Sequence, residues 1–187
     1  MLKQLQNIRR DRWFSFARSE SGVSAIEFVM VAPPVFLLLG MILETGAMFF
    51  TQYALQSAVE TAARSIRTGS AQMNSVSPAS FKASICNSVG SLLDCSKIVV
   101  YVRSDPNFAT MVANMPALVT IGPTTDTSMV VAPVSYNPGY PSKPAIIVAT
   151  YDWYFVSWGM NAFGNAEGNK ADRLIGVSLF QNQAYPG

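Results

Sequence analysis

The sequence contains no histidine, and only 13% of its 187 residues are charged. Histidine is the commonest metal ligand and the usual acid–base group near neutral pH, so its absence argues against a metal site and against most acid–base catalysis. A glycine-rich phosphate loop and a Cys–His pair are also missing. The charged fraction is about half of that in an average soluble domain. The sequence therefore predicts a protein that is not an enzyme and holds no cofactor.

Cysteine is also scarce: the chain contains only Cys86 and Cys95. In an oxidising compartment an even cysteine count favours a disulfide, and closing so short a loop stabilises a fold by about 2–4 kcal/mol. In a reducing compartment the same residues would be buried free thiols. The choice depends on whether this part of the chain is exported.

The few charges are unevenly distributed. Residues 1–22 carry five basic and two acidic side chains, a net charge of +3, whereas residues 23–187 carry −1. The uncharged apolar run at residues 28–43 predicts one membrane span, from residue 28 to about residue 49. A basic arm could bind nucleic acid, but beside an apolar span it sets topology. The positive-inside rule places residues 1–22 in the cytoplasm and exports the C-terminal side.

Helix-forming residues continue beyond the span, and we expect one helix over residues 23–69. Pro33 and Pro34 lie inside it, which predicts a bend or local melting near Ala32. Gly69 is a suitable C-terminal cap. The second half has an apolar stripe at helical spacing, formed by Leu55, Val59, Ala62 and Ile66. Small residues that allow close packing, onto a sheet or onto another subunit, recur at Ala54, Ala58 and Ala62.

Residues 70–187 predict an exported α+β head. A short helix at residues 77–93 begins with Ser77 as N-cap and Pro78 at the first position. Its apolar face comprises Phe81, Ile85, Val89 and Leu92. We expect strands at residues 97–104, 145–156 and 173–183, and a short edge strand at 129–132. Their order predicts a mainly antiparallel meander.

Glu27 stands at the leading edge of the apolar run, where a carboxylate costs several kcal/mol unless it is paired or lies near the interface. A plain signal anchor leaves Gly22 and Glu27 unexplained. An ordinary secretory signal peptide would be cut after residues 45–47, so the mature chain would begin at Met48 and the long helix would be cut at its midpoint. A prepilin-type leader is instead cut before the apolar helix, between Gly22 and Val23.

The prepilin interpretation is supported by a resemblance of this segment to known pilins. GVSAIEF, residues 22–28, is similar to the type IV pilin superfamily, in which a glycine, a cleavage point and four residues precede a glutamate. The proline-containing apolar run, the second glutamate in ILE (residues 42–44) and AAR (residues 62–64) narrow this further. The chain resembles the TadE-like family of tight-adherence (Tad) pili.

This resemblance implies a minor pilin or pseudopilin of a Tad-type (type IVc) pilus, acting in assembly, initiation or the tip complex and supporting surface adherence. Prepilin peptidase would cut after Gly22 and free the amine of Val23. Glu27, followed by Phe28, would neutralise such an amine on a neighbouring subunit during assembly, since two charges in a poorly solvated seam offset their desolvation only when paired. Val23 departs from the Met, Phe or Leu common after the cut, and the mature chain is larger than the major pilins, which favours a minor component.

The resemblance also implies a location and partners. The protein would be a single-pass protein of the bacterial inner membrane with its N-terminus in the cytoplasm and its head in the periplasm, and it could enter the pilus. Its partners would be prepilin peptidase, other minor pilins, the major pilin and membrane lipid, with no nucleic acid. Glu44 keeps two interpretations, a marker of the outer membrane interface or a contact with a partner helix. The alternative function is a signal-anchored exported binding or scaffold protein that does not enter a filament.

Overall fold

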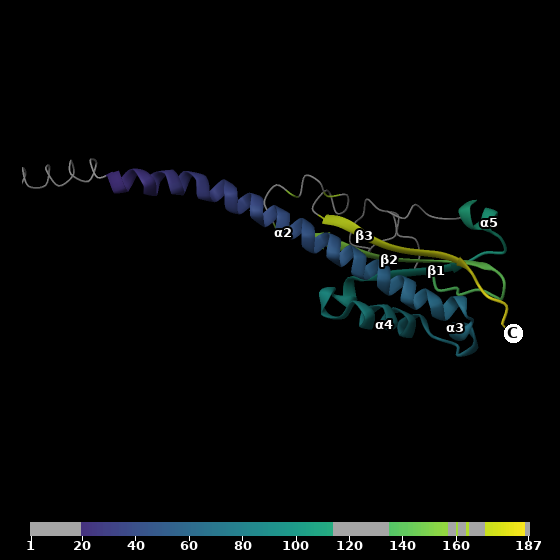
Figure 1. Ribbon diagram of the computed structural model, residues 1–187. Helices are drawn as coiled ribbons and strands as arrows, with labels where there is room; N and C mark the ends of the chain where they lie inside the picture. Colours follow the sequence, from purple (N-terminus) through teal and green to yellow (C-terminus); the bar gives the residue numbers. More distant parts are fainter. Residues whose placement is uncertain (1–19, 114–134, 157–159, 161–163, 165–170, 186–187) are drawn as a thin grey trace, which may run out of the picture. The chain divides into compact units, whose positions relative to one another are not determined.

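The computed structural model describes residues 20–113, 135–156, 160, 164 and 171–185 (Figure 1). The chain divides into two compact units, Met1–Leu43 and Glu44–Gly187. One helix, α2 (Glu20–Arg67), supplies residues to both units. The sequence predicts three parts with different roles: a leader at residues 1–22, an assembly helix at 23–69 and a head at 70–187. This division stays a prediction.

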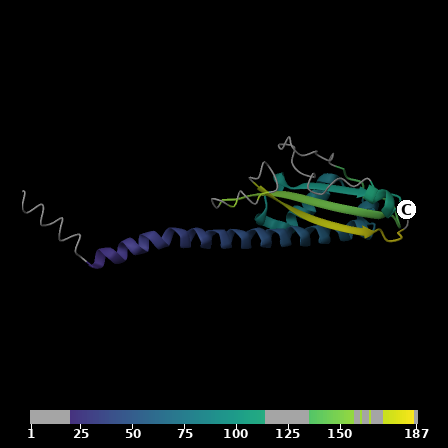
Figure 2. The same cartoon turned by 90° about the horizontal axis from the view of Figure 1, so that it is seen from above.

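Helix α2 (Glu20–Arg67) lies close to its expected bounds. It begins slightly before the expected residue 23 and ends slightly before the expected residue 69. Pro33 and Pro34 lie inside it, and the backbone stays α-helical on both sides of them. The expected local melting near Ala32 is therefore absent, although the early part of α2 curves in Figure 2. A proline removes one hydrogen bond, and a long apolar helix tolerates this loss.

The second unit contains the head, which is α+β as expected. Its elements are α3 (Ser70–Met73), α4 (Pro78–Val89), η1 (Gly90–Leu92), η2 (Cys95–Lys97), β1 (Val99–Ser104), α5 (Phe108–Ala113), β2 (Pro144–Tyr154) and β3 (Ala171–Gln181). The strands form one antiparallel sheet in the order β1-β2-β3, which confirms the meander. The edge strand expected at residues 129–132 lies outside the described residues.

Both faces of the sheet are buried. The register places Val102 beside Ile147 and Ile147 beside Ser178. The first face packs on α2 and α4, in a core that includes Leu55, Val59, Ile66, Phe81, Ile85, Val102, Ile147 and Leu174. The second face buries Tyr101, Ile146 and Val148 together with Met111 of α5. The alternation of side chains along each strand therefore supplies two apolar layers.

Helix α4 begins as expected and ends earlier than expected. The Ser77 side chain caps it by accepting a hydrogen bond from the Ser80 N–H at 3.1 Å. The helix stops because Gly90 has a φ of 60°, a conformation that glycine adopts readily. Leu92 consequently leaves the apolar face and is 47% exposed, whereas the next residue, Leu93, is buried.

Gly69 ends the last turn of α2, as the sequence predicts. Its N–H donates to the Ile66 carbonyl at 3.0 Å, and its φ is 80°. A Cβ at this position would come within 2.3 Å of the Tyr185 ring. The Gln183 N–H donates to the Arg67 carbonyl at 2.8 Å, so the chain after β3 caps the end of α2.

Candidate functional site

The apolar part of α2 in the first unit is uncovered. All of its large apolar side chains from Ile26 to Leu43 except Met41 are between 42% and 76% exposed, and Met41 is half-buried. Soluble monomers rarely expose contiguous apolar surfaces of this extent. Among the described residues, α2 contains the one helical stretch that is long and apolar enough to cross a membrane. A surface of this kind is typical of helices that lie in lipid or pack against other apolar helices.

The predicted processing and assembly residues lie on α2. The backbones of Gly22 and Val23 are part of the helix, and Glu27 and Phe28 are exposed on it. Val23 and Glu27 are separated by one helical turn, a rise of about 6 Å, so they occupy the same side of the helix. This placement is compatible with a carboxylate that meets an amine at the helix start, and the roles of these residues stay predictions.

Glu44 makes a contact that neither interpretation of the sequence anticipated. Its Oε1 accepts a hydrogen bond from the Val156 N–H, just after the end of β2. The contact joins α2 to the end of a strand that is far away in the sequence. Glu44 therefore has a partner within its own head, and its part in assembly stays a prediction.

Two glutamines of α2 bind the outer edge of β3. The Gln52 side chain donates to the Ile175 carbonyl at 2.8 Å and accepts from the Ile175 N–H at 3.1 Å. The Gln56 side chain does the same with Val177, at 3.0 and 2.9 Å. We call this pair of contacts the glutamine ladder. Figures 1 and 2 both show β3 running beside the second half of α2.

The ladder works because two spacings agree. Residues four apart on a helix are separated by a rise of about 6 Å, and residues two apart on a strand by about 6.8 Å. An amide side chain has both a donor and an acceptor, so each glutamine replaces the missing neighbouring strand at one residue. An open strand edge invites pairing with other chains, and the ladder closes part of this edge.

The expected disulfide is present between Cys86 and Cys95, with their Cα atoms 5.7 Å apart. It links α4 to η2. Beside it, Asp94 caps η2 by accepting hydrogen bonds from the Ser96 N–H at 3.0 Å and the Ser96 hydroxyl at 2.7 Å. These hydrogen bonds lower the pKa of Asp94 below its usual value.

A buried ion pair, which the sequence did not reveal, joins β2 and β3. Asp152 and Arg173 are direct cross-strand partners. Their side chains form two hydrogen bonds, at 2.6 and 2.9 Å, and are 3% and 0% exposed. No local pattern marks such a pair, because the two residues meet only through the register of the sheet.

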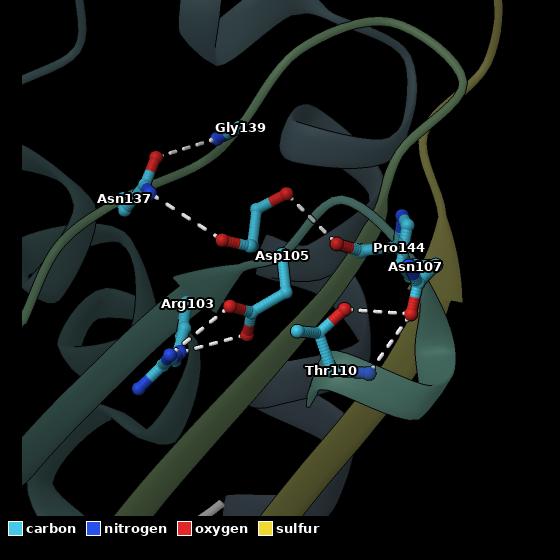
Figure 3. Close-up of polar contacts among 8 residues, drawn as sticks. Arg103, Asp105, Asn107, Thr110, Asn137, Gly139 and Pro144 are labelled. Carbon is cyan, nitrogen blue, oxygen red and sulfur yellow. Dashed lines mark hydrogen bonds and ion pairs between the residues drawn. The ribbon is translucent and has the colours of Figure 1, made fainter. Parts of the chain in front are cut away.

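A second polar group surrounds the end of β1 (Figure 3). Arg103 donates two hydrogen bonds to Asp105, at 2.7 and 3.0 Å, and this carboxylate raises the pKa of the Arg103 guanidinium. Asn107 caps α5 through the Thr110 N–H at 2.8 Å. The Ser104 hydroxyl donates to the Pro144 carbonyl at 2.8 Å. These contacts fix the connections around β1 and β2.

No cluster of three or more potential metal-binding side chains occurs in the part of the chain that the structure describes. The distinctive surface is thus the part of α2 in the first unit, residues 20–43, which we call the bare helix. It carries the predicted processing residues Gly22 and Val23 and the predicted assembly residues Glu27 and Phe28. Residues 22–64 match the family model described as TadE-like protein. This segment is TadE-like. The TadE-like match lies wholly within α2 and ends before the head, and it confirms the resemblance inferred from the residues. Neither the curated proteins nor the solved structures give a match to the chain.

Proposed function

We propose that the chain is a minor pilin or pseudopilin of a Tad-type pilus, acting in pilus assembly, initiation or the tip complex and thereby supporting surface adherence. One observation carries the proposal: the TadE-like segment is a continuous helix whose apolar side chains are uncovered in the first unit. A helix of this kind can pass from lipid into a bundle of similar helices, because both surroundings bury the same apolar surface. The TadE-like match also supports a structural, non-enzymatic role.

Processing would create the charge that Glu27 requires. Prepilin peptidase would remove residues 1–22, and the new amine at Val23 would lie at the start of the helix. When the helix enters an assembly, Glu27 would pair with the amine of a neighbouring subunit and offset the cost of removing both charges from water. Before assembly, the exposed Glu27 carboxylate remains at the membrane surface.

The proposed topology follows from the basic leader and the span. Residues 1–22 would stay in the cytoplasm until cleavage, and the head would lie in the periplasm. The Cys86–Cys95 disulfide supports export, because disulfides persist in oxidising compartments. The partners would be prepilin peptidase, other minor pilins, the major pilin and inner-membrane lipid.

N-terminal sequencing of the mature protein, expressed with a prepilin peptidase, tests the processing step. A chain that starts at Val23 supports the proposal. A start at Met1 indicates a static anchor, the alternative scaffold function, and a start at Met48 indicates ordinary signal cleavage. Either result contradicts the pilin assignment.

The assembly step is tested with Glu27 variants in cells that make the pilus. Glu27→Ala and Glu27→Gln should be processed and remain in the membrane, yet enter pilus fractions less than the wild type does. Glu27→Asp keeps the charge and is the matched control. If Glu27→Gln is incorporated like the wild type, the proposed charge pairing is wrong.

A further inference from the structure

The glutamine ladder leaves the last part of the β3 edge open. Backbone groups of successive strand residues point alternately to either side, so Leu179 presents its N–H and C=O to the same edge as Ile175 and Val177. The position on α2 that follows Gln52 and Gln56 at the same spacing is Glu60. A carboxylate has no N–H to donate to the Leu179 carbonyl.

Glu60 is also engaged elsewhere. Its Oε1 accepts a hydrogen bond from the Gln56 side chain at 2.8 Å. The ladder therefore stops after two residues of β3, and in the described part of the chain no backbone hydrogen bond crosses this edge at Leu179. The Leu179 side chain is 54% exposed beside the open edge.

A pocket of about 650 Å³ lies where the ladder ends. Its lining comes from the last turns of α2, from β3 and from the chain after β3, and includes Glu60, Arg64, Arg67, Leu179 and Gln183. The guanidinium groups of Arg64 and Arg67 form no ion pair with any described residue. Two basic groups against one carboxylate give the pocket a net positive charge.

We propose that this open edge is a docking site for an extended, acidic segment of a partner protein, which adds as a strand beside β3. The backbone of the segment pairs with the N–H and C=O of Leu179, as in other cases of strand addition. Its carboxylates bind Arg64 and Arg67, whose forked donors suit carboxylate oxygens. The exposed Leu179 side chain provides an apolar contact. This docking site is additional to the helix-mediated assembly proposed above.

The test uses the full, uncleaved chain in non-ionic detergent micelles. The probe is the fluorescent peptide acetyl-Val-Glu-Val-Glu-Val-amide, with binding measured by polarisation. Saturable binding is expected, and the peptide with Lys in place of Glu should bind at least about tenfold more weakly. N-methylation of alternate peptide nitrogens removes donors without altering the protein, and it should weaken binding by about tenfold.

Variants of the chain test the same contacts from the other side. Leu179→Pro removes an N–H that the pairing with β2 does not use, and it should weaken binding by about tenfold, while Leu179→Ala keeps the N–H and should bind within about threefold of the wild type. Arg64→Gln with Arg67→Gln should remove the preference for Glu over Lys. Melting temperatures establish that each variant is folded.

Several outcomes would overturn the proposal: no saturable peptide binding, equal binding of the N-methylated and unmodified peptides, or equal binding of the Glu and Lys peptides. Self-association of the chain that depends on Leu179, without peptide binding, would assign the edge to a second copy and also overturn it. Because the uncleaved chain is used, these failures are distinguishable from a failure of the proposed pilus function.

Discussion

Gly176 of β3 lies against Val59 of α2 so closely that a Cβ on the glycine would be 2.9 Å from a Val59 methyl group. The same Cβ would lie 3.2 Å from the Leu55 carbonyl oxygen, and both helix residues are fully buried. Gly176→Ala should therefore lower the free energy of unfolding by about 1–3 kcal/mol, because overpacking forces the helix away from the sheet. Thermal unfolding of the full chain in detergent measures this loss.

Gly46 is the matched control for this substitution. It lies in α2, the helix that Gly176 packs against, and a Cβ there would meet nothing within 4 Å. Gly46→Ala should leave stability unchanged or raise it by up to about 1 kcal/mol, through helix propensity. Equal effects of the two substitutions would show that the close approach at Gly176 does not limit the packing of the head.

The glutamine ladder predicts a specific loss in Gln56→Met. This variant keeps the size of the side chain but leaves the N–H and C=O of Val177 without their partner, at a cost of about 1–3 kcal/mol. Hydrogen exchange of the Val177 amide should accelerate as well. Gln183→Met, the same change at an exposed position, is the control, and an equal drop in melting temperature in both variants would contradict the ladder's role.

The buried ion pair of Asp152 and Arg173 predicts that the losses of stability caused by substituting the two residues are not additive. Asp152→Ala leaves a buried guanidinium without its carboxylate and should cost about 3–5 kcal/mol. The double variant Asp152→Leu with Arg173→Met removes both charges and should recover most of that stability. The single variants Asp152→Leu and Arg173→Met complete the cycle, and a loss in the double variant equal to the sum of their two losses would contradict this account.

The more exposed pair of Arg103 and Asp105 serves as the comparison for this cycle. Its guanidinium side chain is 31% exposed, whereas that of Arg173 is fully buried. Asp105→Asn should therefore cost less than about 1 kcal/mol, since solvent screens the interaction. A cost as large as that of Asp152→Ala would show that burial does not separate the two pairs.

The sequence predicted α2, α4 and the three described strands because each of them has a local signal. The apolar run and the helix-forming residues predicted α2, Ser77 and Pro78 predicted the start of α4, and β-branched runs predicted the three described strands. The position of Leu92 was misjudged because one glycine in the left-handed region ended the helix before it. Local propensity identified that segment but not the turn at which it stops.

Contacts between distant residues were not predictable in the same way. Gln52 and Gln56 look like ordinary polar helix residues until β3 is placed beside them. Asp152 and Arg173 become partners only through the register, and Glu44 meets Val156 only after the chain has folded. These contacts depend on how the elements are placed in three dimensions, and local patterns in the sequence do not reveal that placement. The long apolar helix was predictable because its signal lies in consecutive residues, whereas the roles of Gly22, Val23 and Glu27 on it stay predictions.

The Cys86–Cys95 disulfide predicts that the folded, exported protein does not react with a thiol reagent. Replacing both cysteines by serine should lower the free energy of unfolding by about 2–3 kcal/mol, because the unfolded chain gains the freedom of the opened loop. Reduction of the wild type is the matched control and should lower the free energy of unfolding by a similar amount. If the folded protein is readily labelled by the thiol reagent, the disulfide is absent and this prediction is wrong.

Glu44 and Glu27 should separate stability from assembly. Glu44 accepts a hydrogen bond from the head, so Glu44→Leu should lower the stability of the head by about 1–3 kcal/mol, whereas Glu44→Gln keeps an oxygen acceptor and should cost less. Glu27 is exposed on the bare helix, so Glu27→Gln should leave the melting temperature unchanged and reduce incorporation into pili. If Glu44→Leu melts like the wild type yet blocks assembly, Glu44 acts on a partner helix and its contact with Val156 is incidental.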